Sequence, residues 1–305
     1  MATLTDHPWP HRRGCLCHSP TRRLFTSRLI FGAAAFGAAA TASAREGVDV
    51  GPPSNFSKLV SAAEVENASL QQYLLLKQKA GQQRALGPDD HPQVLRLRTI
   101  AKRMIPHSFE WNPRARDWNW EVNLIGSRQV NAFCMPGGKI AVYSGILEQL
   151  QLSDDEVAMV MGHEISHALR EHAREQMGKS MATRGAVELT TSLFGIKNGG
   201  RLVADMGRQL LSLRFGREDE TEADLIGMEL AARAGYDPAS GVTLWQKMAA
   251  ANKKAPPEFM STHPSGPTRI KDIQASLPKV TGLYARAPKP EQTFGPPPLP
   301  AAKGP

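Results

Sequence analysis

The amino-acid sequence predicts an α+β fold that is mainly helical and has one small sheet. Most of the chain places apolar residues at helical spacing, and only residues 117–143 alternate apolar with polar residues as strands do. The turn sequence Pro136-Gly137-Gly138 divides that segment into short runs that favour strands. With 305 residues and a hydrophobic content of 41%, the chain can form a sizeable core.

The first 44 residues are predicted to be an export signal that precedes the folded domain. A basic start is followed by the Ala/Gly-rich apolar run 29–40 and by small residues up to Ala44, the three-part layout of a secretory signal. Arg22 and Arg23 resemble a twin-arginine signal. The run is too short and too rich in alanine for a membrane anchor, which needs about 20 strongly apolar residues. We therefore expect an exported, periplasmic product.

The distribution of charge argues against a nucleic-acid partner. The formal net charge is +8, but the excess lies in the first 44 residues and in the last segment, and the body between them is close to neutral. No segment after residue 44 is long and apolar enough to cross a membrane. We expect a protein that is not integral to the membrane, with the envelope surface as a peripheral location. Cys134 is the only cysteine after residue 44, so the domain can form no internal disulfide.

In chain order, residues 45–57 are interpreted as a linker, residues 58–283 as the folded domain, and residues 284–305 as a Pro-rich, disordered tail. The first predicted helix, residues 59–86, has Leu70, Tyr73 and Leu74 on its apolar face and stops at Gly87-Pro88. The second, residues 92–105, ends before Pro106. After the strands, the chain is predicted to be helical again up to residue 252.

Three runs in residues 117–143 predict the strands. They are residues 118–124, 130–135 and 139–143. The last run could lie at a sheet edge and bind an extended peptide by strand addition, although a purely structural role fits the pattern equally well.

The segment MGHEISHALREH, residues 161–172, contains the strongest chemical signal. Ser153 and Glu156 form a capping box, which predicts a helix from Ser153 to about Met177. His163 and His167 are four residues apart, so both imidazoles can reach one zinc ion from the same face. Glu164 completes the H-E-x-x-H pattern and is placed to hold a metal-bound water as general base.

His172 is not predicted to be a ligand. On a continuous helix it lies nine residues from His163, about half a turn away, and faces away from the metal. It is therefore interpreted as a residue of the polar face, beside Arg170, Glu171 and Arg174.

The third ligand is expected in the acidic run of residues 217–224. Hydrolytic zinc sites favour two histidines and one carboxylate, with the fourth position open. Glu220 and Asp224 share one helical face, so Glu220 can bind the metal while Asp224 accepts the second ring N–H of a ligand histidine. Glu222 lies on the opposite side and is the second choice for the ligand.

Four motifs in order resemble the HtpX/CAAX prenyl protease family of zinc metallopeptidases, metallopeptidase family 48, and its soluble exported bacterial members in particular. They are Asn131-Ala132-Phe133 with the Pro-Gly-Gly turn, the H-E-x-x-H helix, the run from Arg217 to Asp224, and residues 261–265 followed by Arg269. The resemblance implies a zincin-like (gluzincin) fold with one Zn²⁺ per chain, held by His163, His167 and Glu220. The transmembrane helices and the helical repeat domain of some relatives are not found in this sequence.

The resemblance also implies the activity and further site residues. It implies a zinc endopeptidase that hydrolyses misfolded or misassembled cell-envelope proteins. Asn131 and Ala132 would lie near the substrate cleft. His263 would either stabilise the oxyanion or occupy the open position of the zinc and hold the enzyme inactive. Arg269 would anchor the loop that carries His263, or the transition state.

Two other classes of function remain open from the sequence. One is a chaperone-like periplasmic binding protein whose protease site is idle or self-inhibited. The other is a structural zinc protein, although such sites close all four positions, usually with cysteines, and none are near.

Overall fold

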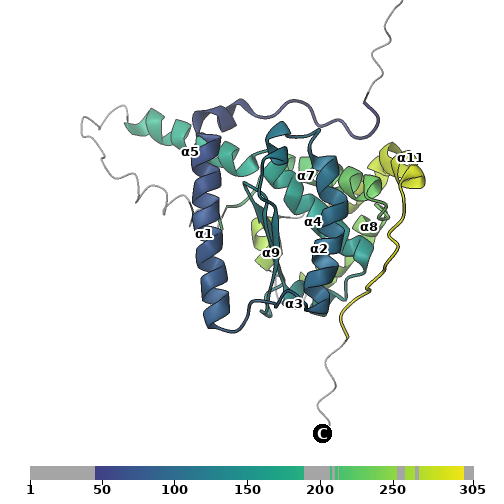
Figure 1. The fold of residues 1–305 in the computed structure, drawn as a ribbon. Helices are drawn as coiled ribbons and strands as arrows, with labels where there is room; N and C mark the ends of the chain where they lie inside the picture. Colours follow the sequence, from purple (N-terminus) through teal and green to yellow (C-terminus); the bar gives the residue numbers. More distant parts are fainter. Residues whose placement is uncertain are drawn as a thin grey trace, which may run out of the picture. The chain divides into compact units, whose positions relative to one another are not determined.

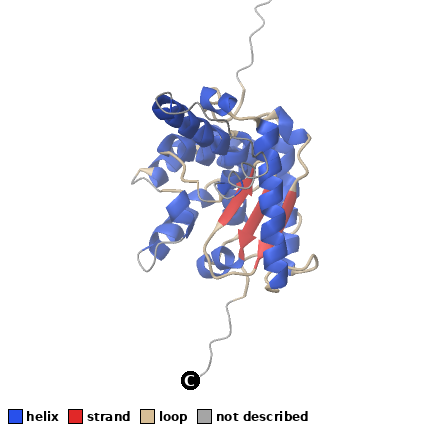
Figure 2. Cartoon of the chain, turned by 90° about the vertical axis from the view of Figure 1, so that its left-hand side faces the viewer, coloured by secondary structure: helices blue, strands red, loops and turns tan. Residues whose placement is uncertain are grey.

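Three short strands form one sheet in the computed structural model of this protein. The structure describes residues 45–188, 207, 210, 211, 213–252, 258–264 and 268–298. The strands are β1 (Glu121–Ile125), β2 (Ala132–Met135) and β3 (Lys139–Tyr143), in the order β1-β3-β2. β2 and β3 are antiparallel across the Pro-Gly-Gly turn, whereas β1 and β3 are parallel. Figure 2 shows the strands side by side among the helices. The predicted α+β, mainly helical fold with a small sheet is confirmed.

Helices make up most of the described chain (Figure 1). The α-helices are α1 (Ala62–Gln82), α2 (Pro92–Met104), α3 (Ser144–Leu150), α4 (Asp154–Leu169), α5 (His172–Glu188), α7 (Arg217–Arg233), α8 (Ser240–Asn252), α9 (Glu258–Thr262), α10 (Arg269–Ser276) and α11 (Pro278–Arg286). Short 3₁₀ helices are η1 (Asn55–Leu59), η2 (Ile105–Ser108) and η3 (Pro113–Arg116). Among the described residues, no helix has the length and apolar character needed to span a membrane.

The edge position predicted for residues 139–143 is wrong. β3 lies in the centre of the sheet, because the chain places β1 beside it in parallel and then turns β2 back onto its other side. The hydroxyl of Tyr73 on α1 donates to the backbone carbonyl of Ile140 in this strand. An edge of the sheet is instead formed by β2, the strand that packs against α4.

α4 is the central helix, and its start agrees with the prediction. The hydroxyl of Ser153 accepts a hydrogen bond from the backbone N–H of Glu156, and the carboxylate of Glu156 accepts one from the N–H of Ser153. Every side chain from Val157 to Leu169 is buried, because β2, α2, α7 and α8 all pack against this helix. The histidines of the motif are therefore core residues.

Two glycines let α4 and α7 approach closely. A Cβ atom added to Gly162 would lie 2.7 Å from the carbonyl oxygen of Gly227, and one added to Gly227 would lie 2.7 Å from the backbone nitrogen of His163. Any larger side chain would push the two backbones apart. This contact brings the first turn of α7 beside the histidines of α4.

The predicted continuation of the motif helix to Met177 is wrong. α4 ends at Leu169, Glu171 adopts a left-handed backbone conformation with φ of 56°, and α5 begins at His172. The side-chain amide of Asn112 donates to the carbonyl of Leu169 over 3.0 Å, so a buried residue outside the helix satisfies its end. The chain changes direction here without a glycine or proline to signal it.

The two helices before the sheet start close to their predicted positions. α2 begins at Pro92 as predicted and buries Val94, Leu97, Ile100, Ala101 and Met104. α1 is shorter than the predicted residues 59–86. It buries Tyr73 as predicted, but Leu70 and Leu74 are exposed, which makes that part of the predicted apolar face wrong.

The chain segments on either side of the domain are more firmly attached than the sequence suggested. Val48 lies in the core, and both Arg45 and the N–H of Val48 bind the fully buried carboxylate of Glu229 on α7. The part of the predicted linker around Arg45 and Val48 therefore belongs to the domain, because Glu229 needs these partners. At the other end, the N–H of Phe294 donates to Asp154 over 2.7 Å.

Residues 284–298, predicted as part of a disordered tail, are also attached to the domain. α11 continues to Arg286, and the segment that follows is held to the domain through Phe294 as far as it is described, to residue 298. The predicted export signal, residues 1–44, and the last residues, 299–305, lie outside the described residues.

Candidate metal centre

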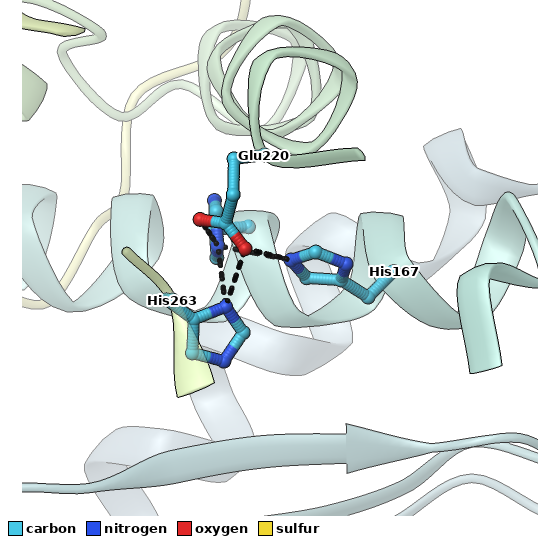
Figure 3. A group of neighbouring side chains, drawn as sticks. His167, Glu220 and His263 are labelled. Atoms are coloured by element: carbon cyan, nitrogen blue, oxygen red, sulfur yellow. Dashed lines mark hydrogen bonds and ion pairs between the residues drawn. The ribbon is translucent and has the colours of Figure 1, made fainter. Parts of the chain in front are cut away.

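Four buried side chains from three parts of the chain converge on one point. His163 and His167 come from α4, Glu220 from the first turn of α7, and His263 from the residue that follows α9. One donor atom of each lies within 4.8 Å of those of the others. In Figure 3, Glu220 reaches from a helix seen nearly end-on toward His167 and His263. The structure thus brings together the three predicted ligands and the loop histidine.

The distances identify the atoms that face the centre. Nε2 of His163 and Nε2 of His167 are 3.1 Å apart. Each lies 3.5 Å from an oxygen of Glu220. Glu222, the second choice for the ligand, lies outside this group and pairs with Arg170 and His172. The preference for Glu220 over Glu222 agrees with this geometry.

Asp224 and Arg269 support His163 and Glu220. Nδ1 of His163 donates to Asp224 over 3.0 Å, which leaves Nε2 free to bind a metal. Arg269 donates to Glu220 over 2.7 Å and to Asp224 over 2.7 Å, and its guanidinium lies 3.4 Å from the ring centre of Trp245. In this structure Arg269 therefore anchors two carboxylates of the centre.

Burial raises the pKa values of Glu220 and Asp224, whereas their hydrogen-bond and charge partners lower them. Burial disfavours the Glu220 carboxylate, but hydrogen bonds with His167 and His263 outweigh it and lower its pKa. The same balance, with Arg269 and His163 as partners, lowers the pKa of Asp224. Both groups are thus held as carboxylates, the form that accepts hydrogen bonds and binds cations.

Glu164 differs from these acids. Burial raises its pKa, and the opposing charges of His263 and His163 do not offset this. Its Oε1 is buried, makes no hydrogen bond with the described residues, and lies 3.5 Å from Nε2 of His263. Glu164 also lines a cavity of about 210 Å³ beside the centre, together with Asn131, Ala132 and His263. A buried acid without a hydrogen-bond partner that faces a cavity is what a general base for a bound water requires.

His263 lies inside the donor group rather than at the mouth of the cavity. Its Nδ1 is 3.0 Å from Oε1 of Glu220 and 3.2 Å from Nε2 of His163. Its ring stacks on Phe259 with centroids 4.5 Å apart. Burial lowers its pKa, but Glu164 and Glu220 together raise it above the ordinary value.

The interpretation of His172 as a polar-face residue is wrong. Its side chain is buried, and its Nδ1 lies 2.8 Å from Nδ1 of His167. The prediction treated residues 153–177 as one continuous helix. The chain instead turns at Glu171, and α5 starts at His172, which places the His172 ring against that of His167. The contact of His172 with His167 is the feature of the centre that sequence reasoning missed, and its only signal was a histidine near the motif.

The donor set fits zinc. Two imidazole nitrogens and one carboxylate are the ligands of hydrolytic zinc sites. The centre also buries the carboxylates of Glu220 and Asp224, which share the guanidinium of Arg269. A divalent cation at this point would give the Glu220 carboxylate a further positive partner.

Comparison with known proteins identifies the family. Residues 93–277 match the family described as Peptidase family M48. The chain is 40% identical to the mitochondrial metalloendopeptidase OMA1 of Arabidopsis thaliana, over 50% of this chain and 30% of that protein. It is 27% identical to the metalloprotease LoiP of Escherichia coli, over 70% of this chain and 81% of that protein. It is 29% identical to the β-barrel assembly-enhancing protease of Yersinia pestis, over 50% of this chain and 33% of that protein.

The match covers 30% of the Arabidopsis OMA1 protein and 33% of the assembly-enhancing protease, so the chain spans well under two thirds of the length of these two relatives. The family match itself covers more than half of the chain and includes every residue of the donor group. The resemblance predicted from the sequence is thereby confirmed, and the chain belongs to peptidase family M48, a family of zinc metallopeptidases.

Proposed function

We propose that this protein is a zinc-dependent endopeptidase that hydrolyses peptide bonds in cell-envelope proteins. The observation that supports this best is the donor group of His163, His167 and Glu220 beside Oε1 of Glu164, which is buried without a hydrogen bond. A structural zinc site would have no use for a buried acid held ready next to the ligands. An idle, chaperone-like site would have no reason to keep the ligands and the base together.

The residues of the centre divide the work of hydrolysis. His163, His167 and Glu220 would hold a zinc ion, which would polarise the scissile carbonyl and make the attacking water more acidic. Glu164 would take a proton from that water and pass it to the leaving amine, since its carboxyl group lines the cavity beside the centre. Asp224 and Arg269 keep His163 and Glu220 in place during the reaction.

The edge strand β2 is the proposed binding surface for the substrate backbone. Ala132 and Phe133 of this strand, with Asn131 before it, line the same cavity as Glu164. An extended peptide can add to such an edge through backbone hydrogen bonds, which gives binding that tolerates many sequences. The strand-addition mode expected from the sequence is kept, but it moves from β3 to β2.

Two observations support the proposed envelope location and substrates. The predicted export signal of residues 1–44 and the similarity to a β-barrel assembly-enhancing protease both favour a periplasmic enzyme that acts on misassembled envelope proteins. Similarity to mitochondrial OMA1 proteins supports the chemistry rather than the compartment.

Removal of the metal tests the proposed activity. A zinc chelator is expected to abolish cleavage of casein or of an unstructured fluorogenic peptide, and stoichiometric Zn²⁺ is expected to restore it. Activity that survives complete removal of zinc would contradict the proposal. A zinc-loaded protein that binds unfolded protein but never cleaves it would favour the chaperone-like alternative.

We also propose that the described conformation is self-inhibited by His263. A catalytic zinc site keeps one position open, whereas a site with four protein ligands is closed. The ring of His263 lies within the donor group, 3.0 Å from Glu220, and so would take the position that water needs. Displacement of the His263 side chain from the donor group would open the site.

Replacement of His263 separates inhibition from an oxyanion role. If the open form is a minor state of about 1–10%, His263→Ala is expected to raise the initial rate on a short peptide by about 10- to 100-fold. Zinc content should stay unchanged, since His163, His167 and Glu220 remain. His107→Ala, a change on η2, serves as the matched control. A fall in rate at unchanged zinc content would show that His263 acts on the oxyanion instead.

A further inference from the structure

We infer that His172 is a positioning residue that holds the zinc ligand His167 through its second ring nitrogen, and that Glu222 anchors His172 in turn. This inference rests on the proposed zinc site. The contacts run in one line, from Nδ1 of His167 to Nδ1 of His172 over 2.8 Å and from Nε2 of His172 to Glu222 over 3.3 Å. His167, His172 and Glu222 thus form a histidine relay between the centre and the far side of α7.

The proton positions of the relay follow from the ligand atom. Nε2 of His167 faces Glu220 and His163, so its lone pair must be free for the metal and its proton must be on Nδ1. That N–H donates to Nδ1 of His172, which therefore carries its own proton on Nε2 and donates to the carboxylate of Glu222. With Nε2 of His167 reserved for the metal, this arrangement of protons satisfies both contacts of the relay.

The two histidine ligands are supported in different ways because of the geometry of α7. Asp224 lies on the same face of α7 as Glu220 and reaches His163 directly, over 3.0 Å. Glu222 lies on the opposite side of the helix and does not reach His167 itself. His172 spans this gap, so Glu222, two residues after Glu220, pairs with a histidine instead of facing the donor group.

Arg170 fixes the outer end of the relay. Its Nε donates to the same oxygen of Glu222 over 2.6 Å, and its two terminal nitrogens donate to the carbonyls of Gly51 and Pro52. The side chain of Arg170 is buried, and so is that of His172. The relay is therefore held at its outer end, and its position depends on the left-handed turn at Glu171 that follows α4.

The inference predicts that zinc affinity depends on hydrogen-bonding ability at position 172. His172→Leu still fills the buried site but removes both ring nitrogens, and it is expected to weaken zinc binding by about 10- to 100-fold. His172→Gln can accept from His167 with Oε1 and donate to Glu222 with Nε2, so it is expected to retain most of the affinity. Competition with a chromophoric zinc chelator measures both values on the full chain.

Three further measurements distinguish positioning from a general loss of structure. Circular dichroism of the zinc-free variants should match that of the wild type. Glu222→Gln should weaken zinc binding in the same direction as His172→Leu, and the double variant should lose less than the sum of both, since they act through one relay. In the zinc-loaded wild type, long-range ¹H–¹⁵N spectra should place the proton of His167 on Nδ1, and His172→Leu should shift that signal. His107→Leu, on η2, is the matched control.

The zinc affinities of the wild type and of the two His172 variants distinguish failure of this inference from failure of the proposed function. Unchanged zinc affinity in His172→Leu would overturn the inference while leaving the zinc endopeptidase intact. Equal losses in His172→Leu and His172→Gln would also overturn it, because they would show that only ring shape matters. A wild-type protein that binds no zinc would overturn both the inference and the proposed function.

Discussion

Replacement of Glu164 by glutamine is expected to reduce kcat by about 10²- to 10⁴-fold while zinc remains bound. The glutamine side chain is nearly isosteric and could still line the cavity, but its amide cannot take a proton from water. The zinc ligands His163 and His167 flank this position and stay unchanged, so the metal content should remain that of the wild type. The loss should appear in kcat more than in KM, because the base acts in the transition state.

The informative measurement is zinc content and peptide hydrolysis on the same preparation. Glu258→Gln is a matched control, since Glu258 lines the same cavity but lies outside the donor group. It should retain most of the activity. Wild-type turnover by zinc-loaded Glu164→Gln would refute Glu164 as the general base.

Replacement of Glu220 by glutamine is expected to have the second large effect, loss of the metal itself. The carboxylate supplies the only charged ligand of the donor group, and its low pKa keeps it ionised. The loss of zinc affinity should exceed the roughly 10- to 100-fold expected for a supporting residue such as His172. Activity should fall with it and return only in part at high zinc concentration.

Glu222→Gln provides the comparison that tests which acid is the ligand. Both acids lie on the first turns of α7, and both substitutions remove one carboxylate. The structure predicts a much larger loss of zinc affinity for Glu220→Gln than for Glu222→Gln. The reverse order would show that Glu222 binds the metal and that the centre is assembled differently.

Much of this centre follows from short-range rules. The capping box at Ser153 marks the start of α4, and a spacing of four residues places His163 and His167 on one face. The same periodicity separates Glu220 and Asp224 from Glu222. These predictions held because each depends on residues within a turn or two of one helix.

The features that could not be predicted depend on contacts between distant segments. α4 ends where the side-chain amide of Asn112 donates a hydrogen bond to the carbonyl of Leu169. Because Asn112 is distant in the sequence, no local signal predicts the turn that buries His172. β3 is central because β1 pairs with it in parallel. The segment around Arg45 is ordered because the buried Glu229 of α7 needs partners. In each case the deciding partner lies far away in the sequence.

The most direct test of the central claim is to locate the metal by anomalous diffraction at the zinc edge, in crystals of zinc-loaded Glu164→Gln. The structure also contains a second acidic and histidine cluster, His172 with Glu175 and Asp219, which offers a specific alternative position. We predict one zinc peak per chain, about 2.0–2.2 Å from Nε2 of His163, Nε2 of His167 and a carboxylate oxygen of Glu220. A peak at the second cluster, or at Glu222, with the first position empty would contradict this account.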